Sequence, residues 1–185
     1  MKHRILLIAS AILAVGVLVT SSTRVFVANS KKKVTTQQNL KYFKRIVMST
    51  PYDVHFVQGD KNVVKLVGPQ AEVASVVLRV SGETLYIERA TRRSRMFFTS
   101  SDDVDIYVTS PDLTQLEIKG SGDFEANRRV DTDQLTVSIN GSGDIDFKDV
   151  ICDKLEASIS GSGDIDFGKV ECLRASAGIH GSGDI

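Results

Sequence analysis

The amino-acid sequence predicts an all-β fold whose C-terminal part is a parallel β-helix, a solenoid with coils of about 20 residues. Three observations support this prediction. The phrase GSGD occurs four times at nearly constant spacing, and apolar residues recur at matching positions of the repeats. The segment before the repeats is a series of short, less regular strands without a helical period.

The composition is that of a globular protein without a charge bias. Of the 185 residues, 42% are hydrophobic and 25% are charged, and the formal net charge is zero. These values exclude a disordered chain, and a neutral chain gives no indication of a nucleic-acid partner. Two cysteines are too few for a disulfide-rich scaffold.

Residues 1–28 are predicted to be a signal peptide or a retained N-terminal anchor. Lys2 and Arg4 precede an uncharged, mostly apolar run over residues 5–19. This run has about the length of a signal-peptide core and is short for a membrane span. Both alternatives imply export to the periplasm, the outer-membrane surface or the medium. Residues 29–40 are polar and lysine-rich, and we predict a linker there.

A single domain is predicted over residues 41–185, and its first part contains short strands. The segments RIVMS, DVHFVQ, VVKLV, VVLRV, TLYIER and DVDIYVT are rich in β-branched and aromatic residues. Turn residues such as Thr50-Pro51 and Ser81-Gly82 separate them. A basic loop, which we expect to be solvated, precedes the last strand and contains Arg92, Arg93, Arg95, Phe97 and Phe98.

Residues 113–185 carry the repeat. GSGD begins at Gly120, Gly141, Gly161 and Gly181, with spacings of 21, 20 and 20 residues. Apolar residues fall into shared columns, of which one is Ile118, Ile139, Ile159 and Ile179. We expect two alternating strands joined by turns in each coil. The chain stops at Ile185, directly after the fourth GSGD. This position predicts that the chain is truncated or that a partner covers the exposed end of the repeats.

The exported start, the stretch VHFVQGD and the tandem GSGDIDF repeats together resemble the head GIN domain family of auto-transporter adhesins from Gram-negative envelopes. The resemblance covers about residues 40–185. It implies a right-handed β-helix, secretion to the periplasm or cell surface, and no established catalytic activity. Members continue through further coils and a closing segment, whereas this sequence ends at Ile185.

The GSGD phrases are the first candidates for a site, and two interpretations are open. Four stacked carboxylates, with Asp146 and Asp166 in a second column, are a candidate calcium site, because Ca²⁺ prefers several oxygen ligands. These four are Asp123, Asp144, Asp164 and Asp184. Alternatively, the carboxylates accept hydrogen bonds from turn amides and the glycines supply the positive φ of a tight corner. We favour the second interpretation, with structural turns at Gly120, Gly122, Gly141, Gly143, Gly161, Gly163, Gly181 and Gly183.

Cys152 and Cys172 occupy one column, which predicts stacked neighbours, either as paired buried thiols or as a disulfide. His55 and His180 are the only histidines beyond the apolar start, and His180 is expected to be a polar turn residue. The sequence contains no serine–histidine–acid order, no HExxH or CxxC motif and no phosphate loop. It therefore predicts no catalytic residue, no cofactor and no metal ligand beyond the calcium alternative.

The predicted function is that of an exported, non-enzymatic envelope protein, an adhesin or surface-binding module. The predicted partner is a glycan or a protein of the envelope or a host surface, with self-association through the C-terminal coil and no nucleic acid. Two alternatives stay open. One is a polysaccharide-processing enzyme with the same fold, and the other is a periplasmic structural or assembly module.

Overall fold

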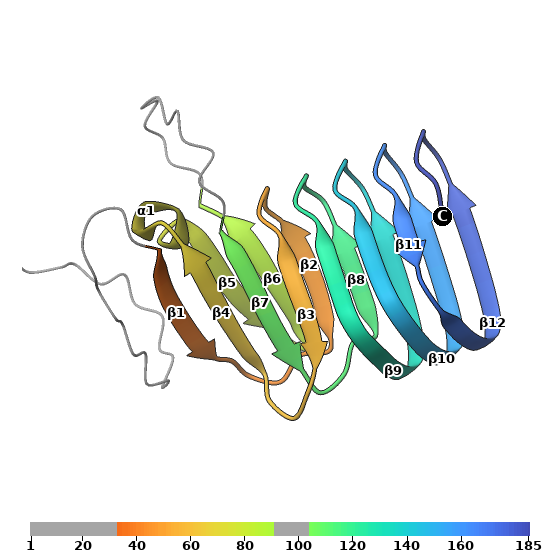
Figure 1. Ribbon diagram of the computed structural model, residues 1–185, viewed down its shortest axis with the longest axis horizontal. Helices are drawn as coiled ribbons and strands as arrows, with labels where there is room; N and C mark the ends of the chain where they lie inside the picture. Colours follow the sequence, from red (N-terminus) through yellow and green to blue (C-terminus); the bar gives the residue numbers. More distant parts are fainter. Residues whose placement is uncertain (1–32, 91–103) are drawn as a thin grey trace, which may run out of the picture.

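The computed structural model describes residues 33–90 and 104–185 (Figure 1). Within these ranges, no helix is long and apolar enough to cross a membrane. The elements described are, in chain order, β1 Val34–Asn39, β2 Arg45–Ser49, β3 Val54–Gln58, β4 Val63–Gly68, α1 Gln70–Val73, β5 Val76–Ser81, β6 Thr84–Arg89, β7 Asp105–Ser110, β8 Gln115–Ile118, β9 Phe124–Ile139, β10 Ile145–Ile159, β11 Ile165–Phe167 and β12 Val170–Ile179.

The predicted fold class, a right-handed parallel β-helix, is wrong, although the fold is all-β. The strands belong to one curled, open sheet of mixed orientation. Nine of them follow the order β1-β4-β7-β3-β9-β8-β2-β6-β5, and β10, β11 and β12 extend the sheet from β9 (Figure 1). Three pairings are antiparallel: β1 with β4, β4 with β7, and β5 with β6.

Chain reversals before the repeats produce these antiparallel pairs. Gly82, with φ of 58°, lies in the turn between β5 and β6, and glycine suits this left-handed conformation because it lacks a Cβ atom. Residues 59–62 likewise reverse the chain between β3 and β4. Because the chain reverses instead of winding in one direction, the sheet stays open, with β1 and β5 as the ends of the nine-strand path.

The predicted linker is wrong in its second half, because Val34–Asn39 form β1. This strand pairs antiparallel with β4, and Val34 is buried. Valine and threonine favour strands, and a strand at a sheet edge needs few apolar side chains, so a polar stretch fits there. The predicted signal or anchor segment and the basic loop at residues 92–98 lie outside the described residues.

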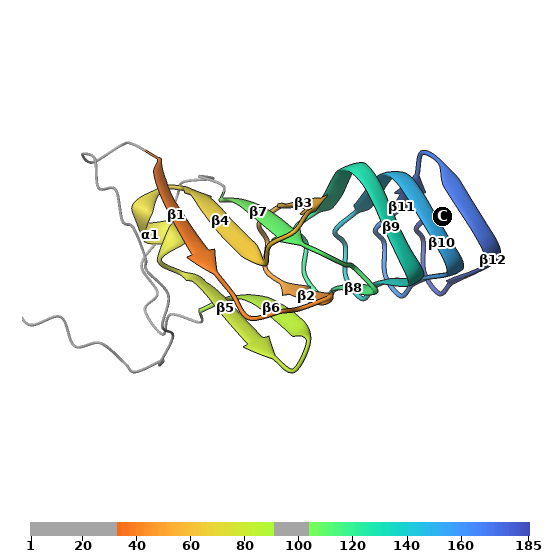
Figure 2. The same ribbon diagram turned by 90° about the horizontal axis from the view of Figure 1, so that it is seen from below.

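The GSGD repeats stack in parallel and in register, as their shared columns predict. β10 pairs with β9 on one side and with β11 and β12 on the other, so that Ile139, Ile159 and Ile179 are direct neighbours. The extra residue of the first repeat is accommodated by a register shift between Phe147 and Asp149. β9 and β10 are continuous bent strands of 16 and 15 residues (Figure 2), where we expected two separate strands in each coil.

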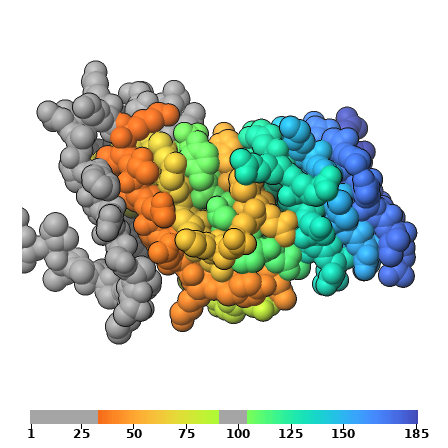
Figure 3. Space-filling view, turned by 60° about the horizontal axis from the view of Figure 1, so that its bottom comes forward, coloured from red at the N-terminus to blue at the C-terminus, as the bar shows by residue number. Residues whose placement is uncertain are grey.

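The inner face of the sheet forms one hydrophobic core that continues through the repeats. Phe56, Phe124, Phe147 and Phe167 form a series of ring contacts with centroids 6.0, 5.5 and 5.6 Å apart. Aromatic pairs of this kind contribute about 0.5–1.5 kcal/mol beyond the burial of their area. On the surface, the repeats follow one another as narrow bands (Figure 3). The core therefore holds the outward side chains of successive strands in a fixed register.

Two columns of glycine let the GSGD turns lie directly on one another. A Cβ atom on Gly143 would lie 2.2 Å from the carbonyl oxygen of Gly122, and one on Gly163 would lie 2.1 Å from that of Gly143. The first glycine of each phrase makes the same approach to the preceding turn. A backbone oxygen cannot move aside without shifting its whole turn, so any other residue type at these positions would force neighbouring turns apart.

The expectation that the repeat glycines provide a positive φ is wrong. In the described ranges, positive φ occurs at Gly82 and Gly161, and the φ of 159° at Gly161 is nearly extended backbone. Close approach between neighbouring turns is the physical reason for glycine here. Sequence alone does not separate the two reasons, since both exclude a Cβ atom.

An earlier copy of the turn, which the spacing of the GSGD phrases does not reveal, lies between β2 and β3. A Cβ atom on Gly120 would lie 2.4 Å from the carbonyl oxygen of Thr50, and one on Gly122 would lie 2.2 Å from that of Tyr52. Residues 50–53, TPYD, therefore occupy the place of GSGD in this stack. In each GSGD turn, a Cβ atom would clash with the turn that precedes it in the stack. The TPYD turn is the first of the stack and therefore tolerates threonine and tyrosine at these positions.

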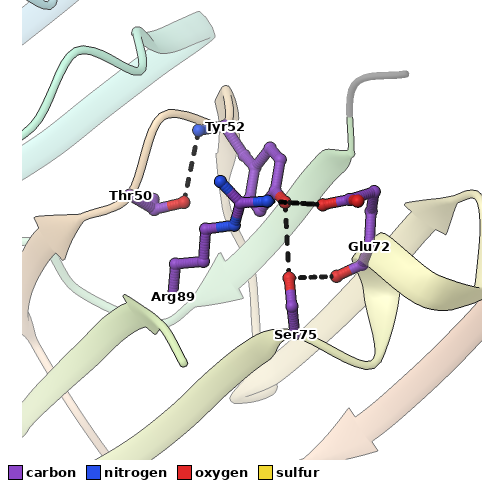
Figure 4. Close-up of polar contacts among 5 residues, drawn as sticks. All are labelled: Thr50, Tyr52, Glu72, Ser75 and Arg89. Atoms are coloured by element: carbon purple, nitrogen blue, oxygen red, sulfur yellow. Dashed lines mark hydrogen bonds and ion pairs between the residues drawn. The ribbon is translucent and has the colours of Figure 1, made fainter. Parts of the chain in front are cut away.

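Tyr52 joins this first turn to α1 and β6 through a polar network (Figure 4). Its hydroxyl donates to Oε2 of Glu72 and lies 3.3 Å from Oγ of Ser75. Nη2 of Arg89 donates to the same carboxylate oxygen at 3.0 Å. Burial, followed by the hydrogen bond to Glu72, raises the pKa of Tyr52 above its ordinary value of 10.0.

Gly143→Ala should lower the free energy of unfolding by about 1–3 kcal/mol, because the new methyl group displaces the neighbouring turn. Gly178→Ala is the matched control, since no atom lies within 4 Å of a Cβ atom built there. Urea denaturation followed by circular dichroism measures both. Equal stability of the two variants would contradict the packing role of the glycine column.

Tyr52→Phe should lower the free energy of unfolding by about 1 kcal/mol near neutral pH, because it removes a buried hydrogen bond. The folded-state pKa of Tyr52 is raised, so its contribution is complete below about pH 10 and is lost as the pH rises through the folded value. Urea denaturation of both proteins at about pH 8 and about pH 10.5 should show the difference shrinking. A constant difference would contradict this account, and Tyr86→Phe, on the same β6 strand as Arg89, provides the control.

Candidate binding surface

The predicted aspartate column lies at the GSGD turns, where each carboxylate binds the next turn. Oδ1 of Asp123 accepts the amide hydrogen of Asp144 at 2.9 Å. Asp144 and Asp164 accept the amides of Asp164 and Asp184 in the same way, both at 2.8 Å. Asp53 begins the series by accepting the amide of Asp123 at 3.1 Å. These hydrogen bonds offset the repulsion between stacked like charges, which is about 1 kcal/mol in a water-like dielectric.

This geometry is the one expected for the structural interpretation of the column. In residues 33–90 and 104–185, no group of three His, Cys, Asp or Glu side chains is arranged to hold a metal ion. A calcium ion at the column would compete with the amides for the same carboxylate oxygens.

The second carboxylate column belongs to a row of side chains that crosses the outer face of the sheet from β4 to β11. Strand pairing places these residues side by side, and the residue before each of them is buried, so the row faces outward. We call this set the outer row: Lys65, Tyr107, His55, Glu125, Asp146 and Asp166.

Direct contacts fix the centre of the outer row. The rings of His55 and Tyr107 stack with centroids 5.0 Å apart, and Nζ of Lys65 lies 4.8 Å from the centre of the Tyr107 ring. Nδ1 of His55 lies 3.0 Å from Oε2 of Glu125, and its Nε2 lies 3.9 Å from Oδ1 of Asp105. Tyr107 is still 40% exposed, so much of its side chain is accessible to a ligand.

The outer row changes in charge along its length. Lys65 lies at one end, whereas Glu125, Asp146 and Asp166 follow one another toward the other end. Asp146 and Asp166 are exposed. The exposed edge and hydroxyl group of an aromatic ring, a cation and accessible carboxylates on a rigid sheet can bind a polar ligand through hydrogen bonds and ion pairs.

The sequence predicts only part of this surface, namely the second column with Asp146 and Asp166. It shows His55 only as one of two histidines beyond the apolar start. The pairing of β3 between β7 and β9 brings His55 and Tyr107 to this column, and the repeat spacing does not reveal that pairing. His180 lies apart, exposed beside the last GSGD, with Nδ1 2.9 Å from the carbonyl oxygen of Ile179.

Cys152 and Cys172 are direct neighbours on β10 and β12, and both thiols are free. Cys152 is buried and Cys172 is partly exposed. Burial, followed by the influence of Cys172 and Asp153, raises the pKa of the Cys152 thiol. Both residues line an open groove of about 430 Å³, whose other lining residues are Asp131, Thr132, Asp133, Ile151, Asp153, Glu171 and Leu173.

Solved structures with a similar fold are described as putative adhesins or as a putative lipid binding protein. The chain aligns with a "putative adhesin" from Parabacteroides distasonis at a TM-score of 0.74 and 20% identity, over 82% of this chain and 63% of that chain. A "putative adhesin" from Bacteroides fragilis gives a TM-score of 0.54 and 20% identity, over 84% of this chain and 97% of that one. A "putative lipid binding protein" from Parabacteroides distasonis gives 0.55 and 15%, over 83% and 97%.

At these identities the similarity shows the fold alone, and the first of these structures agrees with a curled, open, mixed sheet. The chain spans 63% of the length of that structure. A comparison with curated proteins finds no match. A family model described as "Putative auto-transporter adhesin, head GIN domain" matches residues 42–185. Because this match covers most of the chain, the protein belongs to the head GIN domain family, as its repeats predict.

Proposed function

We propose that this chain is an exported, non-enzymatic binding module of the bacterial cell envelope and that its outer row binds a glycan. Family membership and the neighbouring adhesin structures support an adhesive role at the envelope or cell surface. The basic and apolar start of the chain supports export. The outer row is the observation that supports a glycan as the ligand. In this row, a partly exposed aromatic side chain and a series of carboxylates lie on the same face of the sheet.

The chemistry of the outer row suits a sugar chain. His55 and Lys65 cover the two faces of the Tyr107 ring, so its exposed edge and hydroxyl group contact the ligand, and sugar hydroxyls donate hydrogen bonds to the carboxylates. Glu125, Asp146 and Asp166 repeat at the strand spacing of about 4.8 Å, so they present acceptors at regular steps to a ligand built of repeated units. The contacts of His55 with Tyr107 and Glu125 hold these groups before binding, which lowers the entropic cost of association.

The arrangement of the carboxylates supports a non-enzymatic role. Each of the two aspartate columns repeats in register from one repeat to the next, whereas a glycosidase brings two carboxylates together at one singular place. Asp144 and Asp164 bind backbone amides of neighbouring turns, which gives both residues a structural task.

Asp144→Ala should lower the free energy of unfolding by about 1 kcal/mol, because the amide of Asp164 loses its acceptor. Asp146→Ala, two residues along and equally exposed, should change it by less than about 0.5 kcal/mol. Urea denaturation distinguishes the two. The enzyme alternative makes a different prediction: release of reducing ends from a polysaccharide panel that is lost in Asp144→Asn. Such a loss without a change in stability would contradict the structural role.

A glycan array probed with the full chain should give binding that Tyr107→Ala weakens by about tenfold or more, because hot-spot aromatic residues dominate such contacts. Tyr86→Ala is the matched control. Tyr86 also carries a cation over its ring, Arg79 at 4.0 Å, but it lies on β6, outside the outer row. Equal weakening by both substitutions, or no glycan bound at all, would contradict the proposal.

A further inference from the structure

The groove at Cys152 and Cys172 has a geometry that the proposed adhesive role does not use. The two cysteines are paired in register on adjacent parallel strands, so their side chains leave the sheet on the same side. Both line the open groove, which gives a small ion access to the thiols. The site therefore consists of two free thiols at paired positions of adjacent strands.

The spacing of the two strands determines whether the thiol pair is better suited to a disulfide or to a shared metal ion. Side chains in register on adjacent parallel strands leave the sheet nearly parallel to each other, so their Cβ atoms also lie about 4.8 Å apart, beyond the roughly 3.5–4.5 Å that a disulfide prefers. A metal ion placed between two thiolates, with metal–sulfur bonds of about 2.3 Å, spans about 4.6 Å when the three atoms lie in a line. The undistorted register thus suits a linear bridge better than a disulfide.

We propose that Cys152 and Cys172 together bind one soft, two-coordinate metal cation of the Cu(I) class. Thiolate ligands favour soft cations of this kind. Two S–H bonds break and two Cu–S bonds form, the two protons go to solvent, and neither sulfur nor copper changes oxidation state. This site departs from the sequence-based prediction that the cysteines are paired thiols or a disulfide and that no metal is bound.

Charges around the groove assist the entry of a cation. Asp131, Asp133 and Asp153 line it with the two thiols, so the groove attracts positive ions, whereas Glu171, which also lines it, is paired with Lys169. Burial of Cys152 at the inner side keeps this sulfur away from water, which protects a bound soft ion from exchange. Two ligands suffice for linear coordination, and the described residues provide no group of three His, Cys, Asp or Glu side chains for a larger metal site.

Titration of the reduced full chain with Cu(I), in competition with a chromogenic Cu(I) chelator and without oxygen, tests the proposal. We expect one Cu(I) per chain. Cys172→Ser should weaken binding by about 100-fold or more, because the second thiolate no longer binds as an intramolecular ligand. Asp60→Asn, an exposed carboxylate in the turn between β3 and β4 and outside the groove, keeps both thiols and should leave the affinity unchanged.

A pair of variants with equal numbers of thiols tests the spacing. Thr132 precedes Cys152 in the same column and also lines the groove. Thr132→Cys combined with Cys172→Ser creates a new adjacent pair, and tight one-to-one binding should return. Thr132→Cys combined with Cys152→Ser places the thiols two strands apart, about 9.6 Å, and binding should stay weak.

Two outcomes would overturn the proposal. One is equal Cu(I) affinity of the two rearranged variants, since binding would then not depend on spacing. The other is Cu(I) affinity of the natural chain no greater than that of Cys172→Ser. Circular dichroism of every variant, recorded before titration, confirms that weak binding does not arise from unfolding.

Discussion

The close approach of backbone to backbone at the GSGD turns is the constraint on which the rest of the structure depends. At Gly122, Gly143 and Gly163, the space that a Cβ atom would need is already taken by the carbonyl oxygen of the preceding turn. Contact at this distance fixes the register of neighbouring strands, because a slip by one residue would bring a side chain against that oxygen. The aspartate of each phrase then adds a hydrogen bond to the next turn.

Both proposed sites follow from this register. The outer row is continuous because β3, β9, β10 and β11 place corresponding residues side by side, from His55 to Asp166. The two thiols lie side by side for the same reason, one repeat apart on β10 and β12. Neither site requires a special loop. A rigid sheet with outward side chains in regular positions is sufficient to preorganise a ligand surface.

The sequence predicts the all-β class, the family and the columns of the repeat region, because a period of 20 residues aligns the same residue types. It does not predict the topology before the repeats, where pairing is decided by reversals such as the turn at Gly82. The outer row was missed for a related reason: Tyr107 reaches it through the pairing of β7 with β3, which no spacing encodes. The sequence does contain an indication that β3 joins the repeat stack, because DVHF at residues 53–56 has the same pattern as DIDF at residues 144–147.

Amide hydrogen exchange at the GSGD turns tests most directly that these phrases hold the repeats together. Turn amides at a protein surface ordinarily exchange quickly, whereas the amides of Asp144 and Asp164 donate to carboxylates of the preceding repeat. The account predicts that both exchange as slowly as the central strand amides of β10. Exchange at the rate of an unstructured peptide, with the strands still protected, would contradict it.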